Sequence, residues 1–182
     1  KTLITTPPKL IFDKNPKMEK SDKGKSQFTV NTGLPAISGI VYDESDGEFK
    51  HINTCPGAGS CQLVCYARKG FYGMNDGKIL KLIRRLNLLW NNPEEYYHMI
   101  MDELEPIAVK LKRQGRRSGD VDQLVIRWND AGDFFSETYF NIAKRVTEDL
   151  LSDGYDVKSY AYTKQAMFVN LASDKFIMNF SK

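Results

Sequence analysis

The sequence predicts an α/β fold built from parallel β/α units, preceded by an extended arm and a β-hairpin. In the last third of the chain, strand-like and helix-like segments alternate, and two helical apolar periods come before it. A strand-helix-strand-helix-strand order is typical of a parallel sheet with right-handed crossovers. With 182 residues, 41% of them hydrophobic, the chain is long enough for one domain with a substantial core.

The N-terminal part contains the arm and the hairpin. Residues 1–27 are rich in Lys, Pro, Ser and Asp, which predicts an extended or mobile arm before a single domain over 28–182. A β-prone piece at 28–30 follows. Two further pieces, at 36–42 and 49–52, flank Asp46-Gly47, a sequence that favours a hairpin turn.

Two helices are expected next. Apolar residues spaced three and four apart predict a helix over 77–91. Asn92, Pro93 and Glu95 are typical of the start of a second helix. We expect Pro106 to kink or split this helix and Gly115 to end it.

The last third predicts strands at 124–128, 157–162 and 176–180, with helices at 136–151 and 164–172 between them. Ser136 is expected to cap the first of these helices. A parallel strand is normally covered by a helix on each face. We therefore expect the last strand to lie at an edge, or the native chain to continue.

Charge and hydropathy limit the classes of function. The net charge of +3 is not the footprint of a dedicated nucleic-acid-binding protein. The basic cluster Lys110–Arg117 predicts a solvated helix end, with nucleic-acid contact as the alternative. The chain has no apolar run of about 18 residues and no secretory signal, so a cytoplasmic protein without a membrane span is expected.

Three cysteines, Cys55, Cys61 and Cys65, lie close together with the spacing C-x5-C-x3-C. An odd, clustered set argues against a disulfide scaffold and favours a metal site. Cys61 and Cys65 would share one face of a helical turn. Three thiolates on a tight loop (55–70) suit a [4Fe-4S] cluster with one iron left open to another ligand.

Two alternatives to the cluster remain. A structural zinc ion would need a fourth ligand from His51, His98 or an Asp. The cysteines would otherwise be ordinary buried side chains, although a Gly-Pro loop is poor core material. Arg68 and Lys69 follow the cysteines directly and would offset a cluster's negative charge or bind an anionic ligand.

Candidate cofactor-binding or substrate-binding residues follow two predicted strands. Arg127, Asn129, Asp130 and Asp133 would lie at the carboxyl edge of the sheet, where ligands bind in such folds. They would hold a ribose, an amine or a metal, or else cap a helix and form a solvated turn. A buried Arg127 needs a partner, and either aspartate is near in sequence.

Thr163 and Lys164 follow the next strand. Thr163 would cap a helix or face the site. Lys164 would reach a carboxylate or a phosphate.

The motifs Cys-Pro-Gly-Ala-Gly-Ser-Cys, Cys-Tyr-Ala-Arg-Lys-Gly, Arg-Trp-Asn-Asp-Ala-Gly-Asp-Phe-Phe and Tyr-Ala-Tyr-Thr-Lys resemble the phage and bacterial gene-product-88 family over about residues 50–165. This resemblance implies a phage or bacterial protein, but no activity.

The chain also resembles, more distantly, radical S-adenosylmethionine enzymes. That resemblance implies a partial TIM-type barrel, a [4Fe-4S] cluster on the three cysteines, and S-adenosylmethionine near Asp130 and Asp133. The spacing differs from the common C-x3-C-x2-C, and the aromatic residue, Tyr66, follows Cys65 instead of preceding it. The hypothesis is a radical enzyme that binds a small-molecule cofactor and whose substrate the sequence does not name. The alternative is a metal-stabilised binding module that contacts nucleic acid.

Overall fold

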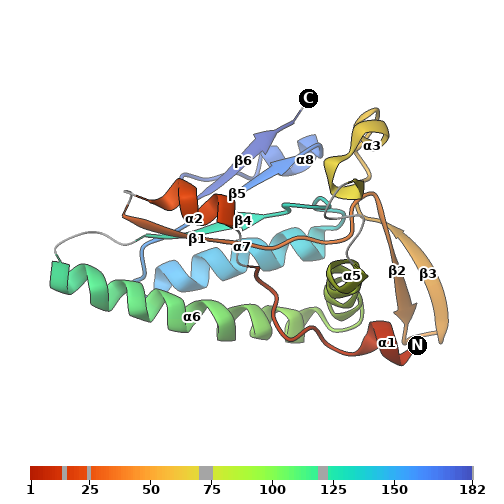
Figure 1. Cartoon of the computed structure of the whole chain (residues 1–182), viewed down its shortest axis with the longest axis horizontal. Helices are drawn as coiled ribbons and strands as arrows, with labels where there is room; N and C mark the ends of the chain where they lie inside the picture. The colour runs from red at the N-terminus through yellow and green to blue at the C-terminus, as the bar shows by residue number, and fades with distance from the viewer. Residues whose placement is uncertain (14–15, 24–25, 70–75, 119–122, 182) are drawn as a thin grey trace.

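A computed structural model describes residues 1–13, 16–23, 26–69, 76–118 and 123–181 (Figure 1). Its main sheet is parallel and has the order β1-β4-β5-β6. The strands are β1 (Gln27–Asn31), β4 (Gln123–Trp128), β5 (Val157–Thr163) and β6 (Phe176–Phe180). The predicted α/β fold with a parallel sheet is confirmed.

Long helices cover one face of this sheet. Figure 1 shows α6 (Pro93–Ser118) and α7 (Glu137–Ser152) on the same side, while the short α8 (Ala166–Val169) connects β5 to β6. Along β5, alternate residues from Val157 to Thr163 are buried. This period of two puts the buried half of β5 on one face of the sheet and leaves the other half on the opposite face.

The predicted hairpin is present as β2 (Ser38–Asp43) and β3 (Glu48–Asn53). Gly47 has a φ of 79° in its turn, a conformation that glycine adopts without a steric cost. The hairpin packs on α5 (Asp76–Asn91). There Asn87 donates to the carbonyl of Ile40 and accepts from the N–H of Tyr42.

The N-terminal segment, for which an arm is expected, forms α1 (Thr2–Thr5) and α2 (Pro16–Asp22) and also enters the core. Ile11 and Phe12 are buried, and both donate backbone N–H groups to the carboxylate of Glu103. Asp13 pairs with the buried Arg85 at 2.9 Å. This salt bridge fixes the segment beside α5.

Two helix predictions need correction. Pro106 does not split α6, which continues past both it and Gly115 to Ser118. Pro106 is exposed, so the backbone carbonyl that loses its intrahelical partner can be solvated. The helix expected over 164–172 is only α8, whose C-cap is Asn170.

Successive parallel strands bring their carboxyl ends to one edge of the sheet. Figure 1 shows α3 (Cys61–Val64) at that edge, beside the ends of β4 and β5. The cysteine segment, which follows the hairpin in sequence, is thereby placed next to residues that follow it by more than sixty positions. Among the described helices, none is both long and apolar enough to cross a membrane.

Candidate functional site

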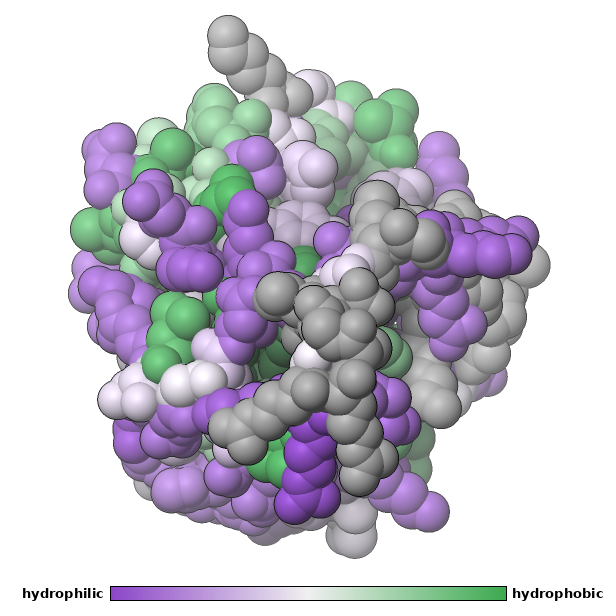
Figure 2. All heavy atoms as spheres, turned by 90° about the vertical axis from the view of Figure 1, so that its left-hand side faces the viewer, coloured by the Kyte–Doolittle hydropathy of each residue, from purple (hydrophilic) through white to green (hydrophobic). Residues whose placement is uncertain are grey.

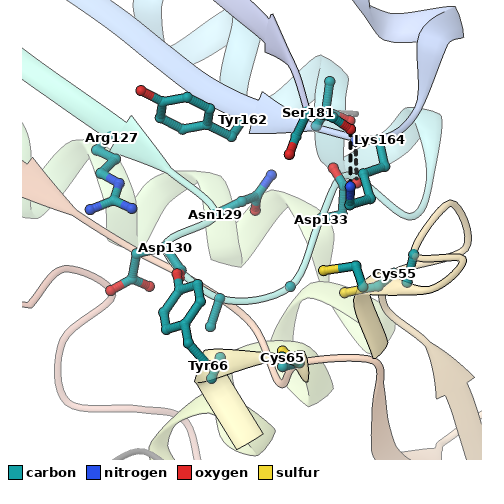
Figure 3. A pocket seen from close by; sticks show the side chains of 17 residues that line it. Cys55, Cys65, Tyr66, Arg127, Asn129, Asp130, Asp133, Tyr162, Lys164 and Ser181 are labelled. Carbon is teal, nitrogen blue, oxygen red and sulfur yellow. Dashed lines mark hydrogen bonds between the residues drawn. The ribbon is translucent and has the colours of Figure 1, made fainter. Parts of the chain in front are cut away.

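A cavity of about 270 Å³ lies at the carboxyl ends of β4 and β5, beneath the cysteine loop (Figure 3). It brings together most of the residues that the sequence predicts as a site. Those that line it are Cys55, Cys61, Cys65, Tyr66, Arg127, Asn129, Asp130, Asp133, Thr163 and Lys164. Arg68 and Lys69 are exposed and do not line it.

The cysteine loop has little regular structure of its own. Cys61 begins α3, and Cys65 separates it from a 3-10 turn, η1 (Tyr66–Arg68). All three cysteines are free thiols and half-buried. A loop without a core needs external contacts to hold its shape.

Two contacts dock this loop onto the strand ends. The N–H of Asp133 donates to the carbonyl of Thr54 at 2.8 Å. Gly57 approaches the chain after β5 so closely that an added Cβ would lie 2.7 Å from the carbonyl oxygen of Lys164. Only glycine allows this approach, because any side chain would push the loop away.

Cys55 accepts a hydrogen bond from a strained residue. The N–H of Ile37 lies 3.2 Å from Cys55 Sγ, and Ile37 has a φ of 69°. A β-branched residue rarely adopts this conformation, and such strain is often stored at functional sites. Burial raises the pKa of the Cys55 thiol to about 11, assisted by the charge of Asp133 and opposed by the Ile37 bond.

Asp133 is already satisfied by backbone donors. Its Oδ1 accepts from the N–H of Phe134 at 2.7 Å, and its Oδ2 accepts from the N–H of Lys164 at 2.9 Å. Burial raises the pKa of this carboxyl, although these bonds oppose the shift. Asp133 thereby joins the ends of β4 and β5. Its role towards a ligand stays a prediction.

Asp130 links three segments of the site. Its Oδ2 accepts from the side-chain amide of Asn31 at 2.7 Å, and its N–H donates to the carbonyl of Thr32 at 3.0 Å. Its own carbonyl accepts from the hydroxyl of Tyr66. Tyr66 therefore ties the cysteine turn to the end of β4. No sequence pattern points to Asn31, which is distant from Asp130 in the chain.

Asn129 is the second non-glycine residue with a positive φ, 59°, among those described. It is only 6% exposed. Its Oδ1 accepts from the hydroxyl of Tyr139 at 2.8 Å, whereas its Nδ2 has no hydrogen-bond partner within the described part of the chain. Tyr139 was missed as a site residue because it belongs to the apolar face of α7.

The two residues after β5 have partners. Thr163 Oγ1 accepts from the N–H of Gln165 at 3.0 Å. The predicted helix cap at Thr163 is wrong, because the N-cap of α8 is Gln165 and no side chain makes a capping bond there. Lys164 donates its Nζ to the carbonyl of Ser181 at 3.0 Å. This bond holds the segment after β6 against the cavity.

The candidate zinc ligands lie in different places. In the described ranges, no group of three or more His, Cys, Asp and Glu side chains is placed to hold a single metal ion. His51 borders a separate hollow on the hairpin side of the cysteine loop, and His98 is exposed on α6 beside the ring of Tyr97.

One family model matches nearly the whole chain. The model of the family described as Gene product 88 matches residues 9–181. The chain belongs to the gene product 88 family. This match confirms the predicted resemblance to that family and extends it beyond 50–165.

No curated protein and no solved structure matches the chain. None of these comparisons matches radical S-adenosylmethionine enzymes, so that resemblance stays a prediction.

Proposed function

We propose that this gene product 88 family member binds a [4Fe-4S] cluster through Cys55, Cys61 and Cys65 and acts as a radical S-adenosylmethionine-type enzyme. One observation carries the proposal: all three cysteines line one cavity at the carboxyl ends of parallel strands. That edge is where parallel α/β folds bind ligands. The four-stranded parallel sheet with long helices on one face supports the α/β class, and the partial barrel is part of the proposal.

We propose a cluster rather than a single ion because the three cysteines line a cavity without forming a single-ion site among the described residues. A tetrahedral zinc ion needs its thiolates within bonding distance of one point, about 2.3 Å from each sulfur, and the described residues form no such group. In a cuboidal cluster each cysteine binds a different iron, so the three sulfurs surround a larger volume. Three half-buried thiols around a cavity match that requirement.

The chain's own groups would hold and shield the cluster. The N–H of Ile37 already points at Cys55 Sγ and would stabilise it as a thiolate. Tyr66, bonded to the carbonyl of Asp130, closes one side of the cavity. When bound, the reduced cluster would supply the electron for cofactor cleavage, while the protein positions the cofactor and excludes water.

The deciding experiment is metal analysis after anaerobic purification. About four iron and four sulfide per chain would support a cluster with one open iron. About one zinc without sulfide would overturn the proposal and leave a zinc-stabilised module. S-adenosylmethionine binding would then be measured on the iron-loaded chain.

The second candidate is a metal-stabilised module that binds single-stranded nucleic acid, with the cysteine loop as a structural staple. Tyr162 favours it, because its ring is 54% exposed beside the cavity and lies 6.3 Å from the ring of Tyr160. Exposed aromatic rings are stacking platforms for bases. Loss of folding when the metal is chelated, together with nucleic-acid binding and no effect of S-adenosylmethionine, would favour this candidate.

The basic cluster Lys110–Arg117 lies elsewhere. It occupies the end of α6, which precedes the amino end of β4 and is opposite to the cysteine loop (Figure 1). Figure 2 looks onto that side and shows mostly hydrophilic side chains with smaller apolar patches between them. The structure therefore separates this cluster from the cavity.

A further inference from the structure

The side chains that line the cavity differ in whether their polar atoms have hydrogen-bond partners. Three of its carboxylate oxygens accept hydrogen bonds: both oxygens of Asp133 accept from backbone N–H groups, and Asp130 Oδ2 accepts from the amide of Asn31. Among the described residues that line the cavity, the buried side-chain atoms without a partner are Nε of Arg127 and Nδ2 of Asn129. Both are donors.

An unsatisfied buried donor is costly, so native proteins seldom leave one without a partner. The donor of Asn129 is held in place by its own geometry. Because Tyr139 donates to Oδ1 at 2.8 Å, the amide turns its NH2 group in the other direction. Figure 3 shows that nitrogen pointing to the side of the cavity where Ser181 and Lys164 lie.

We propose that Asn129 donates a hydrogen bond to an oxyanion of the small molecule held in this cavity, with Tyr139 as its positioning residue. An anion is favoured over a neutral carbonyl because the guanidinium of Arg127 and the ammonium of Lys164 line the same cavity. The two carboxylates that also line it, Asp130 and Asp133, already accept hydrogen bonds from the protein. Charge-assisted bonds of this kind are about twice as strong as neutral ones. The assignment rests on the proposed function, since it names the chemical group that the same site recognises.

The backbone supports this role. The left-handed φ of Asn129, 59°, places its side chain at the end of β4 beneath the cysteine loop. Asn, Asp and Gly adopt this conformation most readily. The substitutions Asn129→Asp and Asn129→Gly therefore remove the donor without forcing the backbone to move.

The test measures dissociation constants for three probes on the iron-loaded chain: S-adenosylmethionine, its decarboxylated form and inorganic phosphate. We expect Asn129→Asp to weaken S-adenosylmethionine binding by about tenfold to a hundredfold. Binding of the decarboxylated form should stay within a factor of about two, because the lost bond is absent there. The matched control is Asn141→Asp, which makes the same change on the exposed side of α7.

Two further variants separate recognition from folding. Asn129→Gly removes the same donor without adding a buried charge, so it serves as the test if Asn129→Asp does not fold. We expect it to show the same loss of affinity. Tyr139→Phe removes only the hydroxyl that orients the amide, so we expect a smaller loss that is again confined to the probe with the carboxylate. A structural defect would weaken both adenosyl probes equally.

The outcomes keep the two proposals apart. Unchanged S-adenosylmethionine affinity in both Asn129 variants would overturn the oxyanion assignment and leave the cluster in place. Binding of phosphate alone, lost in the Asn129 variants, would support the assignment and overturn the proposed cofactor. Binding of neither probe by the wild-type chain would overturn the assignment, while the iron and sulfide content reports on the cluster independently.

Discussion

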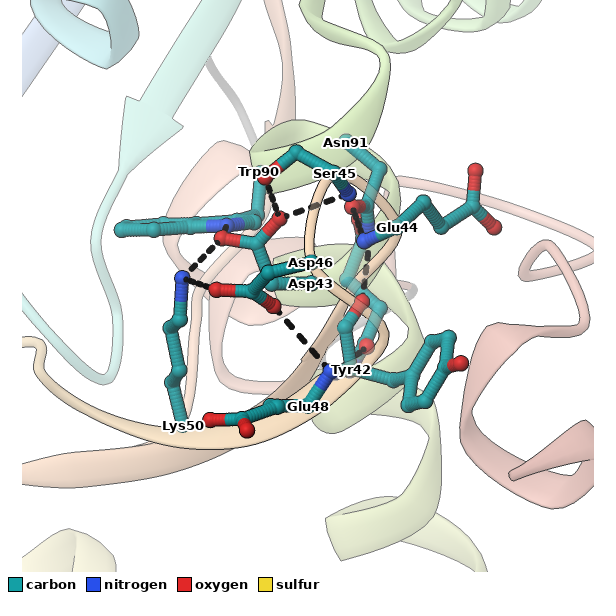
Figure 4. A network of polar contacts seen from close by, with 10 residues as sticks. Tyr42, Asp43, Glu44, Ser45, Asp46, Glu48, Lys50, Trp90 and Asn91 are labelled. Carbon is teal, nitrogen blue, oxygen red and sulfur yellow. Dashed lines mark hydrogen bonds and ion pairs between the residues drawn. The ribbon is translucent and has the colours of Figure 1, made fainter.

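The turn of the hairpin and the cavity at the strand ends are both polar, but they differ in how completely their groups are paired. At the turn (Figure 4), Asp43 Oδ2 accepts from Lys50 at 2.6 Å and from the indole N–H of Trp90 at 3.1 Å. Its Oδ1 accepts from both the N–H and the hydroxyl of Ser45. Asp46 pairs with the same lysine at 2.5 Å.

The cavity keeps donors unpaired in the described structure, at Asn129 and Arg127, and places a strained residue, Ile37, against a cysteine. A cluster of acidic residues that is satisfied by its own lysine has no need of another cation. The comparison teaches that unsatisfied groups and backbone strain, more than the number of charges, indicate where a ligand binds.

The largest effect is expected from Cys61→Ser. Removing one of three thiolates should abolish bound iron while the helices, which do not depend on the loop, stay formed. Iron analysis measures the bound metal, and far-ultraviolet circular dichroism measures the helix content. Ser60→Ala, an exposed change in the same loop, is the control. Full iron retention in Cys61→Ser would contradict a shared site.

The next effect is expected from Gly57→Ala. Its Cβ would lie 2.7 Å from the carbonyl oxygen of Lys164, so the cysteine loop must move away from the strand ends. We expect a loss of about 1–3 kcal/mol in the free energy of unfolding, together with a lower iron content. Denaturant unfolding and metal analysis would show both. Wild-type values for both would mean that the loop is not docked through this contact.

A smaller effect, dependent on pH, is expected at the hairpin turn. Hydrogen bonds from Lys50 first, then from Ser45 and Trp90, hold the pKa of Asp43 well below its ordinary value of 3.8. Because the folded-state pKa is lowered, this carboxylate contributes stability above pH 3.8 that is lost as the pH falls below that value.

Asp43→Asn should therefore destabilise the chain near neutral pH, and this difference from wild type should begin to shrink below pH 3.8, so that it is smaller at about pH 3. Denaturant unfolding, followed by tryptophan fluorescence, measures it at both pH values. Glu44→Gln, an exposed change in the same turn, should show no such dependence. If Asp43→Asn lowers the free energy of unfolding equally at both pH values, the charge of the Asp43 carboxylate is not the cause of the loss.

The smallest effect is expected from Ser136→Ala at the start of α7. The side chain of Ser136 accepts from the N–H of Tyr139 at 3.2 Å, and loss of such a cap costs about 1 kcal/mol. Because the same residue, Tyr139, orients Asn129, oxyanion affinity should fall slightly as well. Thermal unfolding beside the exposed control Thr138→Ala measures the cap. Equal melting temperatures would show that the cap contributes nothing.

Local patterns were enough to predict most elements. The helical period of α5, the cap of α7, the Asp46-Gly47 turn and the three strands of the last third all depend on neighbouring residues. The predictions failed where a local preference competed with a longer context. Pro106 is exposed within a long helix that continues past it, and Ile11 and Phe12 of the expected arm are buried by contacts with α6.

The sequence by itself determined the α/β class, the clustered cysteines and the family. It also determined which residues follow each strand, and parallel strands align those ends at one edge for a general geometric reason. Only the tertiary structure decided that Gly57 touches Lys164, that Ile37 donates to Cys55 and that Tyr139 orients Asn129. These contacts depend on packing between segments whose separation in the chain carries no local pattern, so periodicity and spacing could not predict them.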